Sequence, residues 1–192
     1  MSKRCKWCNL DNPIYVKYHD EEWGHPNFSQ RYLFEMLVLE SFQAGLSWEC
    51  ILNKRESFRE CFDHFDVFSV ASYDEEKIAS LLVNPKIVRN RLKIKAAITN
   101  ALIFLEIEKE FGSFKDYLFS FSKGKTFYDF TSTKSELSDE ISNDLKKRGM
   151  KFVGTTIIYS FLQAIGIIYS HDKECFLYKE DNDEKNQENI SK

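Results

Sequence analysis

The stretch GTTIIYSFLQAIGIIY, residues 154–169, decides the fold class of this chain. Its apolar side chains cover nearly every side of a helix, and a helix without a polar face has to be buried. Tyr159, Ser160 and Gln163 interrupt the run, which is also shorter than the roughly 20 apolar residues of a membrane span. We therefore predict a helix over 154–169 at the centre of a globular protein that does not enter a membrane.

Helical patterns also fill most of the chain before this stretch. Apolar residues recur at three- and four-residue steps between capping residues and glycines, and strand-like alternation is almost absent. The longest pattern covers 86–111 and ends at Gly112. The other predicted helices span 29–45, 47–62, two short segments that begin at Asp66 and Asp74, 114–121 and 134–148. The predicted fold class is all-α, with loops at 84–85 and 124–133.

Length and composition favour a single folded domain. The chain has 192 residues, of which 43% are hydrophobic, against only 7 Gly and 3 Pro, so the disordered and collagen-like classes are excluded. We expect one helical domain over 1–178 and an acidic, disordered tail over 179–192, where Ile190 is the one large apolar residue. The first residues lack the apolar stretch of a signal peptide, so we expect a cytoplasmic protein, and we expect it to be a monomer.

The net charge of −3 conceals two basic clusters. Residues 172–192 hold seven acids and four Lys, which leaves residues 1–171 neutral overall. Two acid-poor runs stand out in this neutral part: Lys86, Arg89, Arg91, Lys93 and Lys95, and then Lys146, Lys147, Arg148 and Lys151. A charge run is usually a solvated face, but two runs that both adjoin predicted turns also suit the phosphates of a nucleic acid.

The cysteines suggest a metal site rather than disulfides. Five cysteines are an odd number in a chain without a secretion signal. His171 and Cys175 are four residues apart, and Cys5 with His19 could complete a tetrahedral set of nitrogen and sulfur ligands. Such a closed set is typical of structural zinc, which here would tie the two chain ends together. Cys5-x-x-Cys8 is itself a metal or redox spacing, so Cys8 is an alternative to His19 as the fourth ligand.

Five motifs follow one another between Arg4 and Cys175. They are Arg4-Cys5-Lys-Trp7, Tyr15-x-x-Tyr18-His19-Asp20-x-Glu22-Trp23-Gly24, Leu39-Glu40-x-x-Gln43-Ala44-Gly45-Leu46-Ser47-Trp48, Lys146-Lys147-x-Gly149-x-Lys151-Phe152-Val153-Gly154 and His171-x3-Cys175. In this order they resemble the 3-methyladenine DNA glycosylase I family of bacteria. The resemblance covers nearly the whole predicted domain.

The resemblance implies an all-α fold of the helix-hairpin-helix glycosylase superfamily and a role in DNA base-excision repair. The enzyme would hydrolyse the N-glycosidic bond of 3-methyladenine in alkylated double-stranded DNA, after the base has been flipped into an aromatic pocket. The pocket carboxylate implied as the catalytic group is Glu40, and the base-binding aromatic residues are Trp7, Tyr15, Tyr18, Trp23 and Trp48. The resemblance also assigns one structural zinc ion to Cys5, His19, His171 and Cys175. In the expected hairpin at 84–86, this chain has Lys86 where the family usually has Gly.

The chemistry of the lesion agrees with these residue types. Methylation at N3 makes adenine a cation and a good leaving group, so little acid catalysis is needed. Trp48 and Tyr18 can face a cationic ring, and Glu40 can accept its N–H groups. A damaged base is also cheaper to flip out of the helix than a well-stacked pair. We nominate no general base, and we expect Lys86, Arg89, Arg91, Lys147 and Lys151 to hold DNA phosphates.

Two other classes of protein remain as alternatives. The first is a catalytically weak lesion- or DNA-binding protein of the same fold, which would require a blocked pocket or a Glu40 side chain turned away. The second is a thiol redox or metal-handling protein that uses Cys5 and Cys8. That second class would leave Trp48 and both basic clusters without a role.

Overall fold

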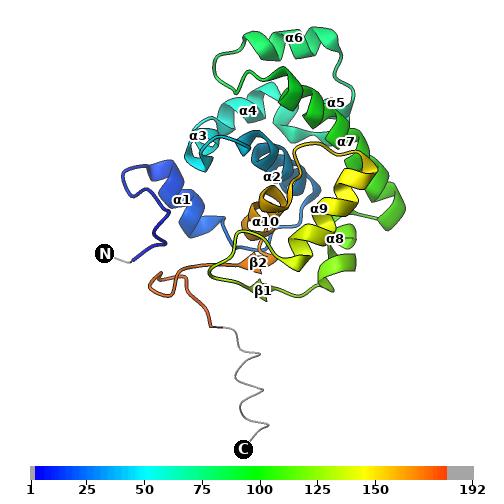
Figure 1. Ribbon diagram of the computed structural model, residues 1–192. Helices are drawn as coiled ribbons and strands as arrows, with labels where there is room; N and C mark the ends of the chain where they lie inside the picture. Colours follow the sequence, from blue (N-terminus) through cyan, green and yellow to red (C-terminus); the bar gives the residue numbers. More distant parts are fainter. Residues whose placement is uncertain (1–2, 181–192) are drawn as a thin grey trace, which may run out of the picture.

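One buried helix, α10 (Thr155–Ala164), forms the centre of the structure, a computed structural model that describes residues 3–180 (Figure 1). It packs against α2 (Gln30–Gln43) on one side and α9 (Glu136–Arg148) on the other. Ile158, Phe161 and Leu162 of α10 have no exposed surface. The prediction of a central apolar helix is confirmed.

A second long helix, α7 (Arg91–Phe111), organises the rest of the core. It packs against α2, α5 (Val67–Ala71), α6 (Glu75–Val83) and α8 (Phe114–Ser122). Phe104 of α7 stacks on Phe114 of α8 with ring centroids 4.1 Å apart. The remaining helices are α1 (Pro13–Glu21), α3 (Trp48–Leu52), α4 (Arg55–Cys61) and the short 3-10 helix η1 (Asp63–Phe65). The described chain is therefore mostly helical, as the sequence predicts.

Two predicted helix boundaries are wrong for local reasons. The helix predicted over 86–111 begins only at Arg91, because the Asn90 side chain caps it by accepting hydrogen bonds from the Leu92 and Lys93 amides. The segment predicted as one helix over 47–62 is two helices, α3 and α4, with a break at residues 53–54. Helix α1 was not predicted, although Asn12 and Pro13 provide an N-cap and a favourable first residue.

The stretch 154–169 does not stay helical to its end. The chain turns at Gly166, where φ is +80° and a Cβ would lie 2.7 Å from the Pro26 nitrogen, so only glycine fits. Strand β2 (Ile168–Tyr169) then pairs in parallel with β1 (Phe127–Tyr128), in the register Phe127 to Ile168 and Tyr128 to Tyr169. This short pair places Asp129 and Ser170, the residues that follow the two strands, next to each other.

The two ends of the described chain lie side by side (Figure 1). The Phe176 amide donates a hydrogen bond to the Lys3 carbonyl oxygen at 2.9 Å, and the Asp172 amide lies 3.3 Å from the Cys5 sulfur. Most of the predicted tail, residues 181–192, lies outside the described residues. Within residues 3–180, no helix has both the length and the apolar character that crossing a bilayer requires.

Candidate functional site

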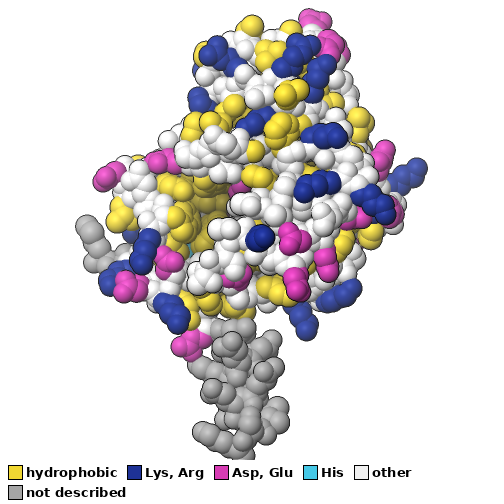
Figure 2. All heavy atoms as spheres, viewed as in Figure 1, with side chains coloured by type: hydrophobic (Ala, Val, Ile, Leu, Met, Phe, Trp, Pro, Cys, Tyr) yellow, Lys and Arg dark blue, Asp and Glu magenta, His cyan; other side chains and the backbone are white. Residues whose placement is uncertain are grey.

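A cavity of about 340 Å³ opens beside α1, and Figure 2 shows it as a hollow with hydrophobic side chains on its walls. All six predicted pocket residues line it: Trp7, Tyr15, Tyr18, Trp23, Glu40 and Trp48. The structure therefore brings together residues from the chain start, α1, α2 and α3. Its other lining residues come from α2, the 129–133 loop, α10 and the segment after β2: Gln43, Asp129, Phe130, Thr131, Ser132, Thr133, Ser160, Gln163, Ser170 and Asp172.

The aromatic side chains form a continuous wall. The Tyr18 and Trp48 rings lie 5.4 Å apart at 51°, and Trp7 contacts Tyr15 at 5.3 Å and Trp23 at 4.8 Å. Asn12 connects the helices that carry the wall, since it caps α1 and donates from Nδ2 to Glu49 of α3 at 2.8 Å. Flat faces at several angles suit a planar ring as ligand.

Glu40 is held inside this wall without a partner. Its side chain comes from the buried face of α2 and is only 4% exposed. No hydrogen bond or ion pair joins its carboxyl group to another residue of the described chain, and burial raises its pKa to about 8. The Trp48 Nε1–H is also buried and has no acceptor among residues 3–180. An unmatched acceptor and an unmatched donor in one cavity point to a ligand that supplies the missing hydrogen bonds.

The charges of the cavity are of one sign. Three carboxyl groups line it, from Glu40, Asp129 and Asp172, whereas none of the residues in its described lining is Lys, Arg or His. Unpaired carboxyl groups next to aromatic faces favour a cationic ligand over a neutral or anionic one.

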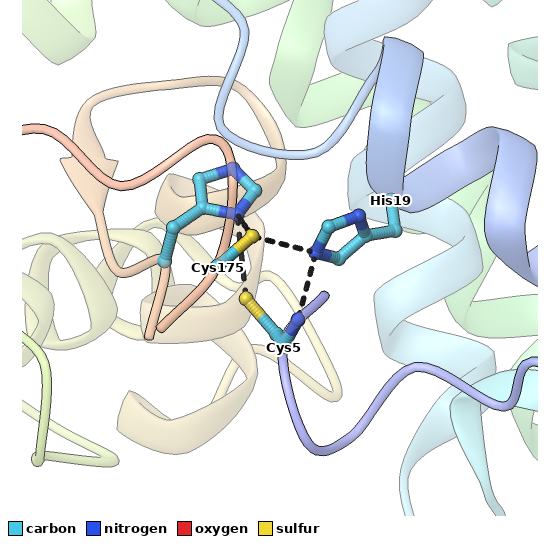
Figure 3. A group of neighbouring side chains, drawn as sticks. Cys5, His19 and Cys175 are labelled. Atoms are coloured by element: carbon cyan, nitrogen blue, oxygen red, sulfur yellow. Dashed lines mark hydrogen bonds between the residues drawn. The ribbon is translucent and has the colours of Figure 1, made fainter. Parts of the chain in front are cut away.

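A second constellation lies behind the aromatic wall. The ligand atoms of Cys5, His19, His171 and Cys175 lie within 4.8 Å of one another, and all four residues are buried (Figure 3). Cys5 Sγ is 3.3 Å from His171 Nδ1, and Cys175 Sγ is 3.5 Å from His19 Nε2 and 3.6 Å from His171 Nδ1. A tetrahedral ion bound through nitrogen and sulfur has ligand edges of about 3.5 Å. The cluster could therefore hold a metal ion.

Hydrogen bonds orient both imidazoles for this role. His19 Nδ1 lies 2.7 Å from Asp20, whose carboxylate is clamped by Arg4 at 2.7 to 3.1 Å, and Arg4 lowers the pKa of Asp20. His171 Nε2 lies 3.3 Å from the Trp23 carbonyl oxygen. Each ring thus directs its other nitrogen toward the cluster, as metal-binding histidines do.

Burial also sets the protonation of this cluster. It raises the pKa of the Cys5 thiol to about 12 and lowers the pKa of His171 to about 4, so neither side chain is charged at neutral pH. Cys8 does not join them, because its sulfur is directed to the Tyr15 carbonyl oxygen at 3.9 Å. Of the two alternatives for the fourth ligand, the geometry favours His19.

The predicted phosphate-binding residues are all exposed, but they differ in their partners. Figure 2 shows Lys and Arg side chains above and to the right of the hollow, on the same face. Arg91 pairs with Glu75 of α6 at 2.5 Å, so a carboxylate from another helix partly neutralises the first basic run. Four side chains make no ion pair with another residue of 3–180: Lys86, Arg89, Lys147 and Lys151.

Lys93, which the sequence places in the same basic run, does not face solvent. It is 7% exposed, and its Nζ donates to the carbonyl oxygens of Phe42 at 2.7 Å and Ala44 at 2.6 Å. Lys93 therefore caps the C-terminal end of α2, next to the pocket residue Gln43. Sequence analysis also missed the polar wall at 129–133, whose only signal was a polar and aromatic loop.

Comparison with known proteins agrees with this geometry. The sequence model of the Methyladenine glycosylase family matches residues 7–178. The chain is 44% identical to DNA-3-methyladenine glycosylase 1 of Escherichia coli (strain K12) over 182 residues, which cover 92% of this chain and 97% of that protein. It is 40% identical to DNA-3-methyladenine glycosylase of Haemophilus influenzae over 181 residues, 91% and 97% of the two chains.

Solved structures give the same result. A crystal structure of 3-methyladenine DNA glycosylase I has a TM-score of 0.88 and 44% identity, and the match covers 92% of this chain and all of that one. A variant of 3-methyladenine DNA glycosylase I in complex with 3-methyladenine has a TM-score of 0.87 and 35% identity, with 92% and 98% coverage. A family model over most of the chain and relatives of 44% and 40% identity agree with the acid-lined aromatic cavity, and they show that this chain belongs to the methyladenine glycosylase family.

Proposed function

We propose that this protein is a DNA base-excision repair glycosylase that releases 3-methyladenine from alkylated DNA. The observation that carries the proposal is the buried, unpartnered Glu40 in an aromatic cavity lined by carboxyl groups and no cation. Such a cavity selects a flat, cationic ring that can donate N–H bonds, and 3-methyladenine attached to deoxyribose is such a ring.

The reaction needs little from the protein beyond binding and orientation. The bond between N9 and C1′ breaks with its electron pair moving to N9, which neutralises the charged base, and positive charge develops on the sugar. Water then bonds to C1′ and gives its proton to solvent. Glu40 accepts N–H groups of the extruded base, while Tyr18 and Trp48 stack against it. No side chain is required to remove a proton from the water.

The neighbouring metal site has a structural role in this proposal. One zinc ion held by Cys5, His19, His171 and Cys175 would join the two chain ends. Its role would be structural, since the four ligands leave no position open for substrate. What the protein gains is a fixed position for Trp23, whose carbonyl oxygen and ring both contact His171. The zinc assignment is supported by the two sulfur and two nitrogen donors at tetrahedral spacing.

The DNA is double-stranded in this proposal, and it lies across the face that carries the cavity mouth. Four exposed basic side chains, Lys86, Arg89, Lys147 and Lys151, would contact phosphates, with Arg91 as a weaker participant because it pairs with Glu75. The protein acts as a monomer in the cytoplasm, with residues 1–178 as its glycosylase domain of the helix-hairpin-helix type. The hairpin at 84–86 presents Lys86 rather than a glycine.

The test is release of free base from duplex DNA treated with a methylating agent, with the products separated by chromatography. The proposal predicts release of 3-methyladenine by the metal-loaded wild-type protein at enzyme concentrations near that of the lesion. Tight binding to methylated duplex without release would favour the lesion-binding alternative. If the protein neither binds methylated duplex nor releases the base, both functions lose their support.

A further inference from the structure

The cavity has a second acidic group whose role the proposed function leaves open, and this group is Asp129. It follows β1 directly, and its amide donates to the Tyr169 carbonyl oxygen at 3.1 Å. Its Oδ1 accepts hydrogen bonds from the amides of Thr131 at 3.2 Å and Ser132 at 3.1 Å. The strand pair and this tight turn together fix the carboxylate on the cavity wall.

Asp129 and Glu40 share one cavity but have opposite surroundings. Partial burial raises the pKa of Asp129, but the hydrogen bonds from the Thr131 and Ser132 amides, together with the Ser132 and Tyr159 side chains, outweigh burial and hold this pKa below its ordinary value. Glu40 receives no such donors, and burial raises its pKa to about 8. At neutral pH Asp129 is therefore an anion, whereas most Glu40 groups carry a proton until a cation beside them favours the ionised form.

The charge of Asp129 is also uncompensated. Asp129 makes no ion pair with a described residue, and the lining contains no basic side chain. The third acid, Asp172, is different, because it accepts the Lys6 amide at 2.7 Å and directly follows the cluster residue His171. Next to Asp129, the Ser170 hydroxyl is buried without a partner and adds a polar group to the same wall.

We propose that Asp129 is a specificity-determining residue, which supplies the fixed negative charge that makes the pocket prefer a cationic base to a neutral one. The proposal rests on the proposed function and adds a division of labour to it. Asp129 attracts the charged base before any contact forms, and Glu40 then accepts its N–H groups. Because positive charge moves from the base to the sugar during cleavage, Asp129 acts on capture of the lesion more than on the chemical step.

The variant Asp129→Asn tests this inference, because the amide oxygen of Asn can still accept both turn hydrogen bonds while the charge is lost. Single-turnover release of 3-methyladenine is measured against protein concentration. The half-saturating concentration should rise roughly 5- to 30-fold, as for loss of one charge that acts across the cavity, and the maximal rate should stay within about threefold. Glu136→Gln, an exposed residue outside this cavity, is the matched control for the change in net charge and should match wild type.

A second measurement uses a neutral ring of the same shape. Duplex DNA containing 3-deaza-3-methyladenine, which carries no charge on the base, should bind wild type and Asp129→Asn with equal affinity. An unchanged half-saturating concentration for 3-methyladenine in Asp129→Asn would overturn the inference, as would an equal loss with the neutral ring. If wild type releases no 3-methyladenine, the proposed function fails instead, and the two failures are thereby distinguished.

Discussion

The indole ring of Trp23 lies edge-on against the imidazole of His171, with ring centroids 4.7 Å apart and planes at 82°. The same indole lines the cavity, and the Trp23 carbonyl oxygen lies 3.3 Å from His171 Nε2. One residue is thus shared by the pocket and the Cys/His cluster. A change in the cluster should therefore alter the position of Trp23 in the pocket, although none of the four cluster residues is part of the described cavity lining.

Loss of the metal should first reduce stability. In Cys175→Ser one thiolate ligand is removed, so we expect loss of about one zinc ion per chain and a melting temperature at least about 5 °C lower. Metal analysis and thermal unfolding measure both. Cys8→Ser is the control, because Cys8 lies outside the cluster and should keep the ion. Full zinc content in Cys175→Ser together with loss in Cys8→Ser would show that the ligand set is wrong.

The buried carboxyl group of Glu40 predicts a pH-dependent stability. Its pKa is about 8 in the folded protein, against an ordinary value of 4.5. The folded state therefore holds this proton more tightly, and stability is lost as pH rises from about 4.5 to 8. Glu40→Gln removes the penalty, so its melting temperature relative to wild type should increase from pH 5 to pH 8. Each 1 kcal/mol corresponds to about 2–4 °C at this size. If the melting temperatures of the two proteins change in parallel with pH, the Glu40 side chain is solvated and its pKa is not raised.

Lys93 should be a stabilising residue rather than a DNA contact. Lys93→Met removes the donor to the Phe42 and Ala44 carbonyl oxygens, and unfolding free energy should fall by about 1–3 kcal/mol. Lys95→Met is a matched control, because Lys95 is exposed and pairs only with Glu75 among the described residues. Its effect should stay within about 0.5 kcal/mol. Chemical denaturation of the three proteins compares these values, and equal stability of both variants would contradict the capping role.

Two neighbouring arginines should differ in their contribution to DNA affinity. Arg89 makes no ion pair with a residue of 3–180, whereas Arg91 is held by Glu75. Arg89→Ala should weaken binding to all duplex sequences and reduce the slope of log affinity against log salt by about 1. Arg91→Ala should have a smaller effect on that slope. Salt titrations of binding measure both, and an unchanged slope in Arg89→Ala would place the DNA footprint elsewhere.

Local sequence signals explain which parts of the fold could be predicted. The central position of α10 follows from its apolar composition, since no face of it could remain in water. The start of α7 could have been predicted, because Asn90 is a strong N-cap residue. The predicted helix began too early because the apolar Ile87 fits the same helical pattern. The pairing of 127–128 with 168–169 could not be predicted from the sequence, because a strand of two residues is too short to show alternation. The two strands are also about forty residues apart in the chain.

The aromatic residues and Glu40 of the site were predicted from the sequence, whereas the polar wall at 129–133 was missed. Glu40 and Trp48 stand in motifs whose resemblance implies positions in the base pocket, and both line the cavity. Asp129 stands in no motif, and its place depends on a strand pair that only the folded chain reveals. Lys93 looked like a surface charge because its sequence neighbours are basic. Only the position of the α2 end shows that it is buried.

If the buried carboxyl group of Glu40 recognises the cationic base, removal of its charge should slow excision of the lesion. Single-turnover release of 3-methyladenine from methylated duplex DNA is compared between wild type and Glu40→Gln, with melting temperature and DNA affinity recorded for both. Since a hydrogen bond to a charged group contributes about 1.5 to 3 kcal/mol, excision should be roughly 10- to 150-fold slower in the variant, with affinity for undamaged DNA unchanged. Excision at the wild-type rate by a fully folded Glu40→Gln protein would contradict this role of Glu40, because shape and leaving-group chemistry alone would then suffice.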